Sequence, residues 1–132
     1  MRNSKNGGFT LVEIMIVVAI IALLAAIAVP GFLRARKRAQ GTSIKNDLRL
    51  IDAAVDQYAI EYNLGNATLD FTQLTRYFKT GTNLSNGAGI LTGVNYASVT
   101  YPVGTLPVVP TVAVSQLSDV CDDAFWSPYP TS

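Results

Sequence analysis

One long apolar segment constrains this chain more than any other feature. Residues 9–33 read FTLVEIMIVVAIIALLAAIAVPGFL, which is 25 residues with a single charge, Glu13. At about 1.5 Å per residue, a helix of this length reaches roughly 37 Å, more than the ~30 Å hydrocarbon core of a bilayer. A chain of 132 residues has too little remaining surface to cover such a helix on every side. The segment therefore predicts a membrane span.

Two simpler interpretations of this segment compete with a specialised one. A cleaved secretory signal needs a shorter apolar region that ends at an A-x-A-like site, and this run is too long and leads directly into polar residues. A plain membrane anchor stays open. Glu13 argues against it, because an unpaired carboxylate in a span costs about 2.5–3.5 kcal/mol at the centre and less near an end, so it normally has a partner. The alternative is that Glu13, one turn inside the run, reaches the lipid headgroups.

Composition excludes most familiar catalytic chemistry. The chain has no histidine and one cysteine, Cys121, so histidine triads, HExxH zinc sites, CxxC redox pairs and intrachain disulfides are impossible. We expect no enzyme activity, a single small head domain, and a buried Cys121, with an intermolecular disulfide as the alternative. From residue 50 onward, two basic residues stand against seven acidic ones, so no nucleic-acid surface is expected on the head.

The residues around the start of the apolar run carry a family resemblance. Residues 1–8 form a short basic leader that ends in Gly8, Phe9 follows it, Glu13 is the fifth residue after Gly8, and Pro30 lies inside the run. Together they resemble the N-terminus of a type IV prepilin or of a type II secretion pseudopilin. The resemblance covers about the first 60 residues and is only architectural beyond them.

The resemblance implies how the N-terminus is processed. A prepilin peptidase would cut between Gly8 and Phe9 on the cytoplasmic side and then N-methylate Phe9. Glycine suits the position because it has no side chain to hinder approach to the scissile backbone. In the family, the residue matching Glu13 pairs with the new Phe9 amine of a neighbouring subunit, so Glu13 and Phe9 are the expected assembly residues.

The resemblance also implies location, partners and function. Residues 1–8 would be a cytoplasmic leader, residues 9–33 the transmembrane and polymerisation helix, and residues 34–132 the helix continuation and a small periplasmic head. The chain would be a single-pass protein of a bacterial inner membrane that is extracted into a filament on assembly. Its partners would be other pilin-like subunits, the prepilin peptidase, an inner-membrane assembly platform and membrane lipid.

Three functions remain open at this point. The first is a structural subunit of a type IV pilus-like filament, most specifically a type II secretion pseudopilin that assembles a periplasmic pseudopilus for protein export. The second is a type IV pilin for adhesion, twitching motility or DNA uptake. The third is a single-span membrane protein with a binding head that never polymerises.

The fold expected beyond the span is α+β, with a long N-terminal helix whose C-terminal half packs on a small head. Apolar residues spaced by three and four predict that the helix continues to about Tyr62: Ile44, Leu48, Ile51, Val55, Tyr58 and Tyr62. Pro30 and Gly31 predict a helix break, as a kink or a locally melted turn, with a helix end at Val29 as the alternative. Gly65 is expected to end the helix with a positive φ.

The head is expected to contain a short helix and a few antiparallel strands. Residues 70–79 read as the helix, with Asp70 as N-cap and Phe71, Leu74 and Phe78 facing inward. Residues 94–103 and 108–115 read as strands because they are rich in valine. The aromatic segment 125–130 is expected to pack on the head, with an exposed strip for a partner as the alternative.

Two features of the sequence fit less simply. Four basic residues lie at positions 34–38, against two in the leader, and the positive-inside rule would place the C-terminal part in the cytoplasm, opposite to the orientation that the motif implies. We give the motif priority.

No cofactor is expected. Three acidic residues near the end of the sequence are weak candidates for calcium ligands, but they lack EF-hand spacing: Asp119, Asp122 and Asp123. The favoured interpretation is a solvated acidic turn.

Overall fold

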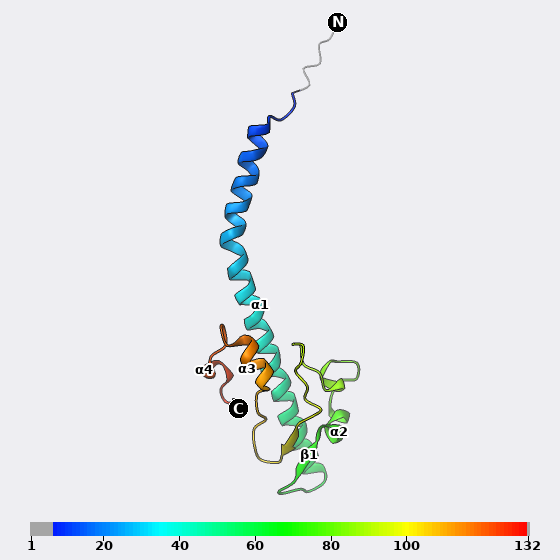
Figure 1. Cartoon of the computed structure of the whole chain (residues 1–132). Helices are drawn as coiled ribbons and strands as arrows, with labels where there is room; N and C mark the ends of the chain where they lie inside the picture. Colours follow the sequence, from blue (N-terminus) through cyan, green and yellow to red (C-terminus); the bar gives the residue numbers. More distant parts are fainter. Residues whose placement is uncertain (1–6, 132) are drawn as a thin grey trace. The chain divides into compact units, whose positions relative to one another are not determined.

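The computed structural model describes residues 7–131, which form two compact units that divide between Ala35 and Arg36. A single element, helix α1 (Leu11–Glu61), contributes to both units (Figure 1). The second unit continues with the following short elements: β1 (Thr68–Asp70), α2 (Phe71–Leu74), the 3-10 turns η1 (Thr75–Tyr77) and η2 (Leu84–Asn86), β2 (Thr100–Pro102), α3 (Thr111–Leu117) and α4 (Asp123–Trp126). The predicted α+β class with a long N-terminal apolar helix is confirmed.

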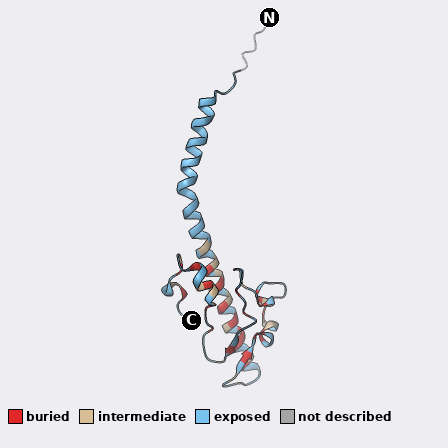
Figure 2. Ribbon diagram, viewed as in Figure 1, coloured by how far each residue is buried: buried red, intermediate tan, exposed pale blue. Residues whose placement is uncertain are grey.

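The second unit is built on one face of α1. The buried residues of this helix recur every three or four positions, which is the period of a one-sided helix: Gly41, Ile44, Leu48, Ile51, Ala54, Val55 and Ala59. Figure 2 shows burial confined to this unit, while α1 residues of the first unit are exposed. The predicted extent of the helix is confirmed to within one residue, although Tyr62 at the end of the predicted stripe is exposed.

Helix α1 ends in a Schellman motif centred on Asn63. Asn63 has φ of 52° and donates its backbone N–H to the Ile60 carbonyl oxygen at 3.3 Å. The Leu64 N–H donates to the Ala59 carbonyl oxygen at 2.8 Å. The prediction that Gly65 would supply the positive φ was wrong, because asparagine tolerates the left-handed region and reaches it two residues earlier.

The sheet is smaller than expected. β1 pairs antiparallel with β2, and the buried Leu69 lies opposite the buried Tyr101. The predicted strand 94–103 contracts to Thr100–Pro102, because Pro102 cannot donate to a ladder and Val94 instead donates its N–H to the Leu91 carbonyl in a turn.

The predicted strand at 108–115 was wrong, since residues 111–117 form α3. Ala113 and Leu117 are fully buried, and their spacing of four places them on one face of α3. Val109, which precedes the helix, is fully buried as well. Pro110 stands directly before the helix, where its missing N–H costs nothing. Burial of this face therefore overrides the preference of Val112 and Val114 for extended backbone.

The helix predicted at 70–79 begins where expected but is shorter. Asp70 is the N-cap, and its backbone N–H donates to the Gln73 side-chain oxygen at 2.8 Å. After Leu74 the backbone tightens into the 3-10 turn η1. Phe71, Leu74 and Phe78 are buried as predicted, and the Phe71 and Phe78 rings stack with centroids 5.5 Å apart.

The C-terminal segment, residues 121–131, packs on α1 as expected for its aromatic residues. Trp126 has no exposed surface, and Tyr129 is buried. The Lys45 ammonium on α1 donates hydrogen bonds to two carbonyl oxygens, that of Phe125 at 2.8 Å and that of Ser127 at 2.9 Å. These two bonds join parts of the chain that are about eighty residues apart.

Gly41 allows the C-terminal segment to approach α1 closely. A Cβ atom at this position would lie 2.8 Å from the Cys121 sulfur and 3.0 Å from the Phe125 ring. Cys121 itself is buried, as predicted, and burial raises the pKa of its thiol. A glycine inside a helix costs about 1 kcal/mol relative to alanine, so the close approach is the reason for this residue here.

We predict that Gly41→Leu destabilises the second unit by about 1–3 kcal/mol, because the added side chain overlaps Cys121 and Phe125. The measurement is thermal unfolding of the full chain in detergent, followed by tryptophan fluorescence at Trp126. Gly31→Leu is the matched control, since nothing lies within 4 Å of a Cβ there. Equal melting temperatures for the two variants would contradict the packing argument.

Candidate processing and assembly site

The predicted cleavage position lies in exposed backbone just before α1. Gly7, Gly8 and Phe9 are all exposed, and Phe9 exposes 86% of its surface. Among residues 7–131, nothing beyond the chain neighbours lies within 4 Å of a Cβ built on Gly7 or Gly8. The backbone between Gly8 and Phe9 is therefore open to approach by another protein. Residues 1–6 of the predicted leader lie outside the described part of the chain.

Helix α1 starts with a reciprocal pair of hydrogen bonds between Thr10 and Glu13. The Glu13 N–H donates to the Thr10 hydroxyl oxygen at 3.2 Å, and the Thr10 N–H donates to Glu13 Oε2 at 3.2 Å. This is a capping box, which satisfies two of the free N–H groups at a helix start and places a negative charge near the positive end of the helix dipole. The structure thus gives Glu13 a partner inside its own chain.

This capping role of Glu13 is not among the predictions made from the sequence. The signal was present, because Thr10-Leu-Val-Glu13 directly before an apolar run matches the T-x-x-E pattern of a capping box. The contact does not involve the Phe9 amine, which exists only after cleavage. Pairing of Glu13 with the Phe9 amine of a neighbouring subunit stays a prediction.

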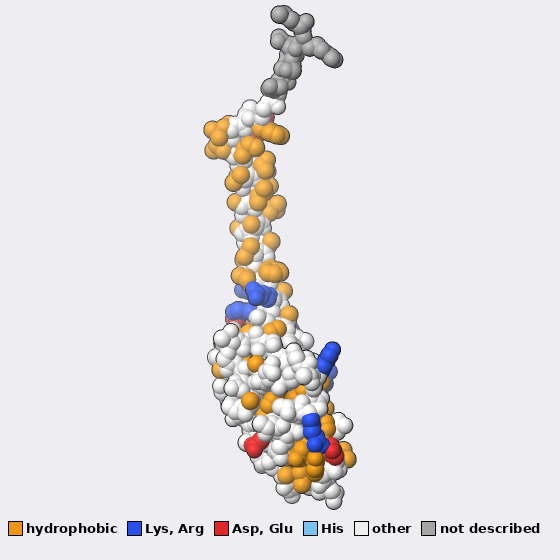
Figure 3. All heavy atoms as spheres, turned by 90° about the vertical axis from the view of Figure 1, so that its right-hand side faces the viewer, with side chains coloured by type: hydrophobic (Ala, Val, Ile, Leu, Met, Phe, Trp, Pro, Cys, Tyr) orange, Lys and Arg blue, Asp and Glu red, His pale blue; other side chains and the backbone are white. Residues whose placement is uncertain are grey.

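Residues 11–33 of α1 are apolar on every side apart from Glu13. All residues from 11 to 35 are exposed in the single chain, including large side chains such as Leu11, Ile27 and Phe32. Hydrophobic side chains cover this part of the helix in Figure 3. It is the only helix among the described residues that is long and apolar enough to cross a membrane. Such a surface requires lipid or other apolar helices around it.

The locally melted turn predicted at Pro30 and Gly31, and the alternative helix end at Val29, are absent from the single chain. Helix α1 runs through both residues. Proline removes only its own hydrogen bond to the carbonyl four residues earlier, and the helical residues on both sides hold the backbone in place. The locally melted turn was therefore wrong for this state, and unwinding within a filament is not tested by it.

The candidate calcium ligands all have other contacts. Asp119 forms an ion pair of 2.8 Å with Lys37. Asp122 caps α4 by accepting the Phe125 N–H at 2.9 Å, and Asp123 accepts a hydrogen bond from the Thr131 hydroxyl at 3.3 Å. Within residues 7–131, no three histidine, cysteine or acidic side chains gather in a way that could hold a metal ion.

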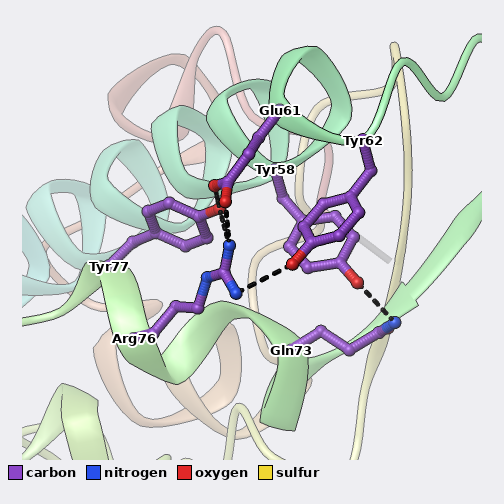
Figure 4. A network of polar contacts seen from close by, with 6 residues as sticks. All are labelled: Tyr58, Glu61, Tyr62, Gln73, Arg76 and Tyr77. Carbon is purple, nitrogen blue, oxygen red and sulfur yellow. Dashed lines mark hydrogen bonds and ion pairs between the residues drawn. The ribbon is translucent and has the colours of Figure 1, made fainter.

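A second polar cluster holds η1 against the last turns of α1 (Figure 4). The Arg76 guanidinium lies 5.1–5.7 Å from the ring centroids of Tyr58, Tyr62 and Tyr77. It also donates to the Tyr62 hydroxyl at 3.0 Å and forms an ion pair with Glu61. No motif in the sequence pointed to Arg76, because its partners on α1 and just after it lie fourteen to eighteen residues earlier in the chain.

Glu61 is the acidic member of this cluster. The Tyr77 hydroxyl donates to one of its oxygens and Arg76 to the other. Hydrogen bonds from Tyr77 and then from Arg76 hold the pKa of the Glu61 carboxyl below its ordinary value. Both partners favour the charged form, so the cluster is strongest when Glu61 is ionised.

Comparison with known proteins assigns the N-terminal segment. A family model described as the prokaryotic N-terminal methylation motif matches residues 3–29. The chain is 48% identical over 63 residues to the type IV wide pilus major component PilA4 of Thermus thermophilus, covering 48% of this chain and 47% of that protein. It is 41% identical over 61 residues to the type II secretion system core protein G of Pseudomonas aeruginosa, covering 46% and 43%.

A third relative is also named as a type IV pilin. The type IV major pilin protein PilA of Myxococcus xanthus is 44% identical over 59 residues, covering 45% of this chain and 27% of that protein. The chain therefore spans less than half the length of each of these relatives. No solved structure matches the chain. The motif and the names of the relatives support the family that the N-terminal residues suggested.

The Glu61 cluster predicts a pH-dependent contribution to stability. Since the folded pKa of Glu61 is lowered, its contribution is complete above the ordinary value of 4.5 and is lost as the pH falls through the folded value. The melting temperature of the native chain should therefore exceed that of Glu61→Gln most at neutral pH, and the difference should shrink in acid. Burial raises the pKa of Asp47, so the contribution of Asp47 to stability changes with pH in the opposite direction. This contribution is the same in both chains and cancels in their difference.

The measurement is thermal unfolding of both chains in detergent between about pH 3 and pH 7, where carboxylates titrate. Only the difference between the chains reports Glu61. A difference that stays constant over this range would contradict the prediction.

Proposed function

Since the chain carries the N-terminal segment of the type IV pilin and pseudopilin family, we propose that it is a structural subunit of a pilus-like filament, most specifically a type II secretion pseudopilin. The observation that carries this proposal is an exposed Gly8–Phe9 bond directly before a helix that is apolar on every side. The first feature suits a processing enzyme, and the second suits lipid before assembly and neighbouring helices afterwards. The family is structural, and we propose no catalytic activity.

The choice of a pseudopilin rests on the relatives. Proteins named type II secretion system core protein G from several bacteria match the chain, among them those of Klebsiella michiganensis at 33% identity and Escherichia coli at 35%. A type IV pilin for adhesion, twitching motility or DNA uptake is the second candidate, favoured by the 48% identity to the Thermus pilus component.

We propose the following topology and partners. The apolar helix and the methylation motif fit a single-pass protein of the inner membrane. The leader would lie in the cytoplasm, where the prepilin peptidase cuts and methylates, and the head in the periplasm. An inner-membrane assembly platform would then add the subunit to a filament of identical or related subunits.

Glu13 has two successive roles in this proposal. Before assembly, the capping box gives the carboxylate hydrogen-bond partners at the start of the helix. After cleavage, Phe9 carries a positive amine, and a neighbouring Glu13 can pair with it. Two charges that are each costly in lipid become tolerable together, and a subunit docked out of register leaves Glu13 without that partner.

The first test is the intact mass of the chain purified from membranes of a cell with a prepilin peptidase. We expect a product that begins at N-methylated Phe9. Gly8→Val should keep Met1, because a branched side chain hinders access to the scissile bond, whereas Gly7→Val should still be cut. Both positions are open in the structure, so they form a matched pair. A native chain that still begins at Met1 would favour the static anchor.

The second test concerns assembly. We predict that Glu13→Val inserts and is cleaved but lowers the yield of sheared filaments by about tenfold, because the Phe9 amine loses its partner in lipid. Thr10→Val breaks the capping box but leaves the carboxylate, so it should assemble better than Glu13→Val. Filament yield from Glu13→Val equal to that of the native chain would overturn the assembly role.

A further inference from the structure

The head contains a groove of about 490 Å³ between α1 and the segment 77–90. Two large apolar side chains in its lining reach the surface, Leu50 of α1, which is 46% exposed, and Ile90, which is 48% exposed. The buried side chains of Phe78 and Leu84 line it as well. The volume falls within the roughly 300–1,000 Å³ of ligand-binding pockets. The groove is thus large enough for one long side chain and its neighbouring backbone.

A single carboxylate, that of Asp47, lies in this mainly apolar lining. Its Oδ2 atom accepts a hydrogen bond of 3.2 Å from the Tyr96 hydroxyl. Within residues 7–131, its Oδ1 atom has no hydrogen-bond partner, and both ion pairs are formed by other residues. Burial raises the pKa of the half-buried Asp47, because the loss of water outweighs the hydrogen bond from Tyr96. The groove therefore presents a negative charge to which the described chain supplies no cation.

The Asp47 carboxylate is held in place from within the head. Tyr96, which donates to it, exposes only 1% of its surface. The buried Tyr101 in turn donates its hydroxyl to the Tyr96 carbonyl oxygen at 2.9 Å. A carboxylate that is positioned in advance loses little freedom when a ligand binds. This arrangement favours a defined binding geometry over a loose surface contact.

Two asparagine side chains in the lining are available for hydrogen bonds. The amides of Asn46 and Asn83 form none within residues 7–131. Each amide has donors and an acceptor, and a polypeptide backbone needs both. Lys79 also lines the groove, is exposed, and takes part in neither ion pair of the described residues. Its positive charge disfavours a ligand with several cations.

We propose that this groove binds a lysine or arginine side chain that another polypeptide presents. The cation pairs with Asp47, and the aliphatic stem lies along Leu50 and Ile90. The amides of Asn46 and Asn83 bond to the backbone on either side of the bound residue. The site goes beyond the proposed function, because it lies on the head and requires neither cleavage nor assembly.

The chemistry of the lining favours this occupant over two others. An apolar segment would cover Asp47 without giving it a cation, which is costly for a buried carboxylate. A metal ion needs several acidic or other ligands, and no group of three such residues lies together within residues 7–131. A lysine or arginine side chain supplies both the cation and the apolar stem that the lining calls for.

The first experiment titrates the full native chain, labelled with nitrogen-15 in detergent, with two blocked pentapeptides. One has a lysine between two leucines, with alanine at each end, and the other has norleucine in place of the lysine. The lysine peptide should shift the amide signals of residues 43–50 and 77–90, and it should bind at least about tenfold more tightly than the norleucine peptide. n-Butylamine, which has the same cation and stem without a backbone, should bind more weakly than the lysine peptide.

The second experiment removes the charge of the groove. Asp47→Asn keeps an acceptor for the Tyr96 hydroxyl but loses the negative charge, so it should weaken binding of the lysine peptide by about tenfold. Asp56→Asn is the matched control, since Asp56 is an exposed acid of the same helix outside the groove, and it should bind like the native chain.

A third set of variants changes the surface of the groove without altering the core. Leu50→Gln should weaken binding, because the aliphatic stem loses part of its apolar wall. Ile60→Gln, at an exposed position of the same helix outside the groove, should not. Lys79→Gln should bind the lysine peptide at least as tightly as the native chain does, because a like charge is removed.

The outcomes decide the proposal independently of the proposed function. Equal affinities for the two peptides, or for the native chain and Asp47→Asn, overturn the cation site. Binding of n-butylamine as tight as that of the lysine peptide overturns the polypeptide as its occupant. All titrations use the unassembled chain, so a lack of binding leaves the filament role standing, and a failure to form filaments in cells leaves the groove standing.

Discussion

Everything in this chain depends on a change in the surface of one helix. Up to Leu33, α1 is apolar on every side apart from Glu13, so it requires surroundings other than water. From Gly41 onward only one face is buried and most of the other residues are polar, so the same backbone serves as the base of a head in water. One helix thus provides both the segment that needs an apolar environment and the base on which the head folds.

The head is held to that base by contacts at both of its ends. Near the end of α1, Arg76 lies among three tyrosine rings and pairs with Glu61, which fixes η1. Further back, Lys45 holds the C-terminal segment over the space that Gly41 leaves open. Both sets of contacts use only part of the helix circumference, so that Arg49 and Asp56 take part in neither of the two ion pairs of the described residues.

Structural features set by residues that are close in the sequence could be predicted, whereas features set by contacts between distant residues could not. The span, the helix extent and the Asp70 cap follow from local spacing. The Thr10–Glu13 box was equally local and was overlooked because Glu13 was interpreted only through its charge in lipid. α3 was mistaken for a strand because burial of Ala113 and Leu117, decided by the rest of the head, outweighs valine propensity. The Arg76 cluster could not be predicted, because its residues come together only in the folded head.

The Lys45 bonds have a consequence for the order of events during synthesis. The ribosome adds their acceptors, the carbonyls of Phe125 and Ser127, about eighty residues after Lys45, and the apolar segment comes before both. Contacts between such distant residues cannot form until the later residues have emerged. The N-terminal helix can therefore enter a bilayer before the head has finished folding, and the head closes last.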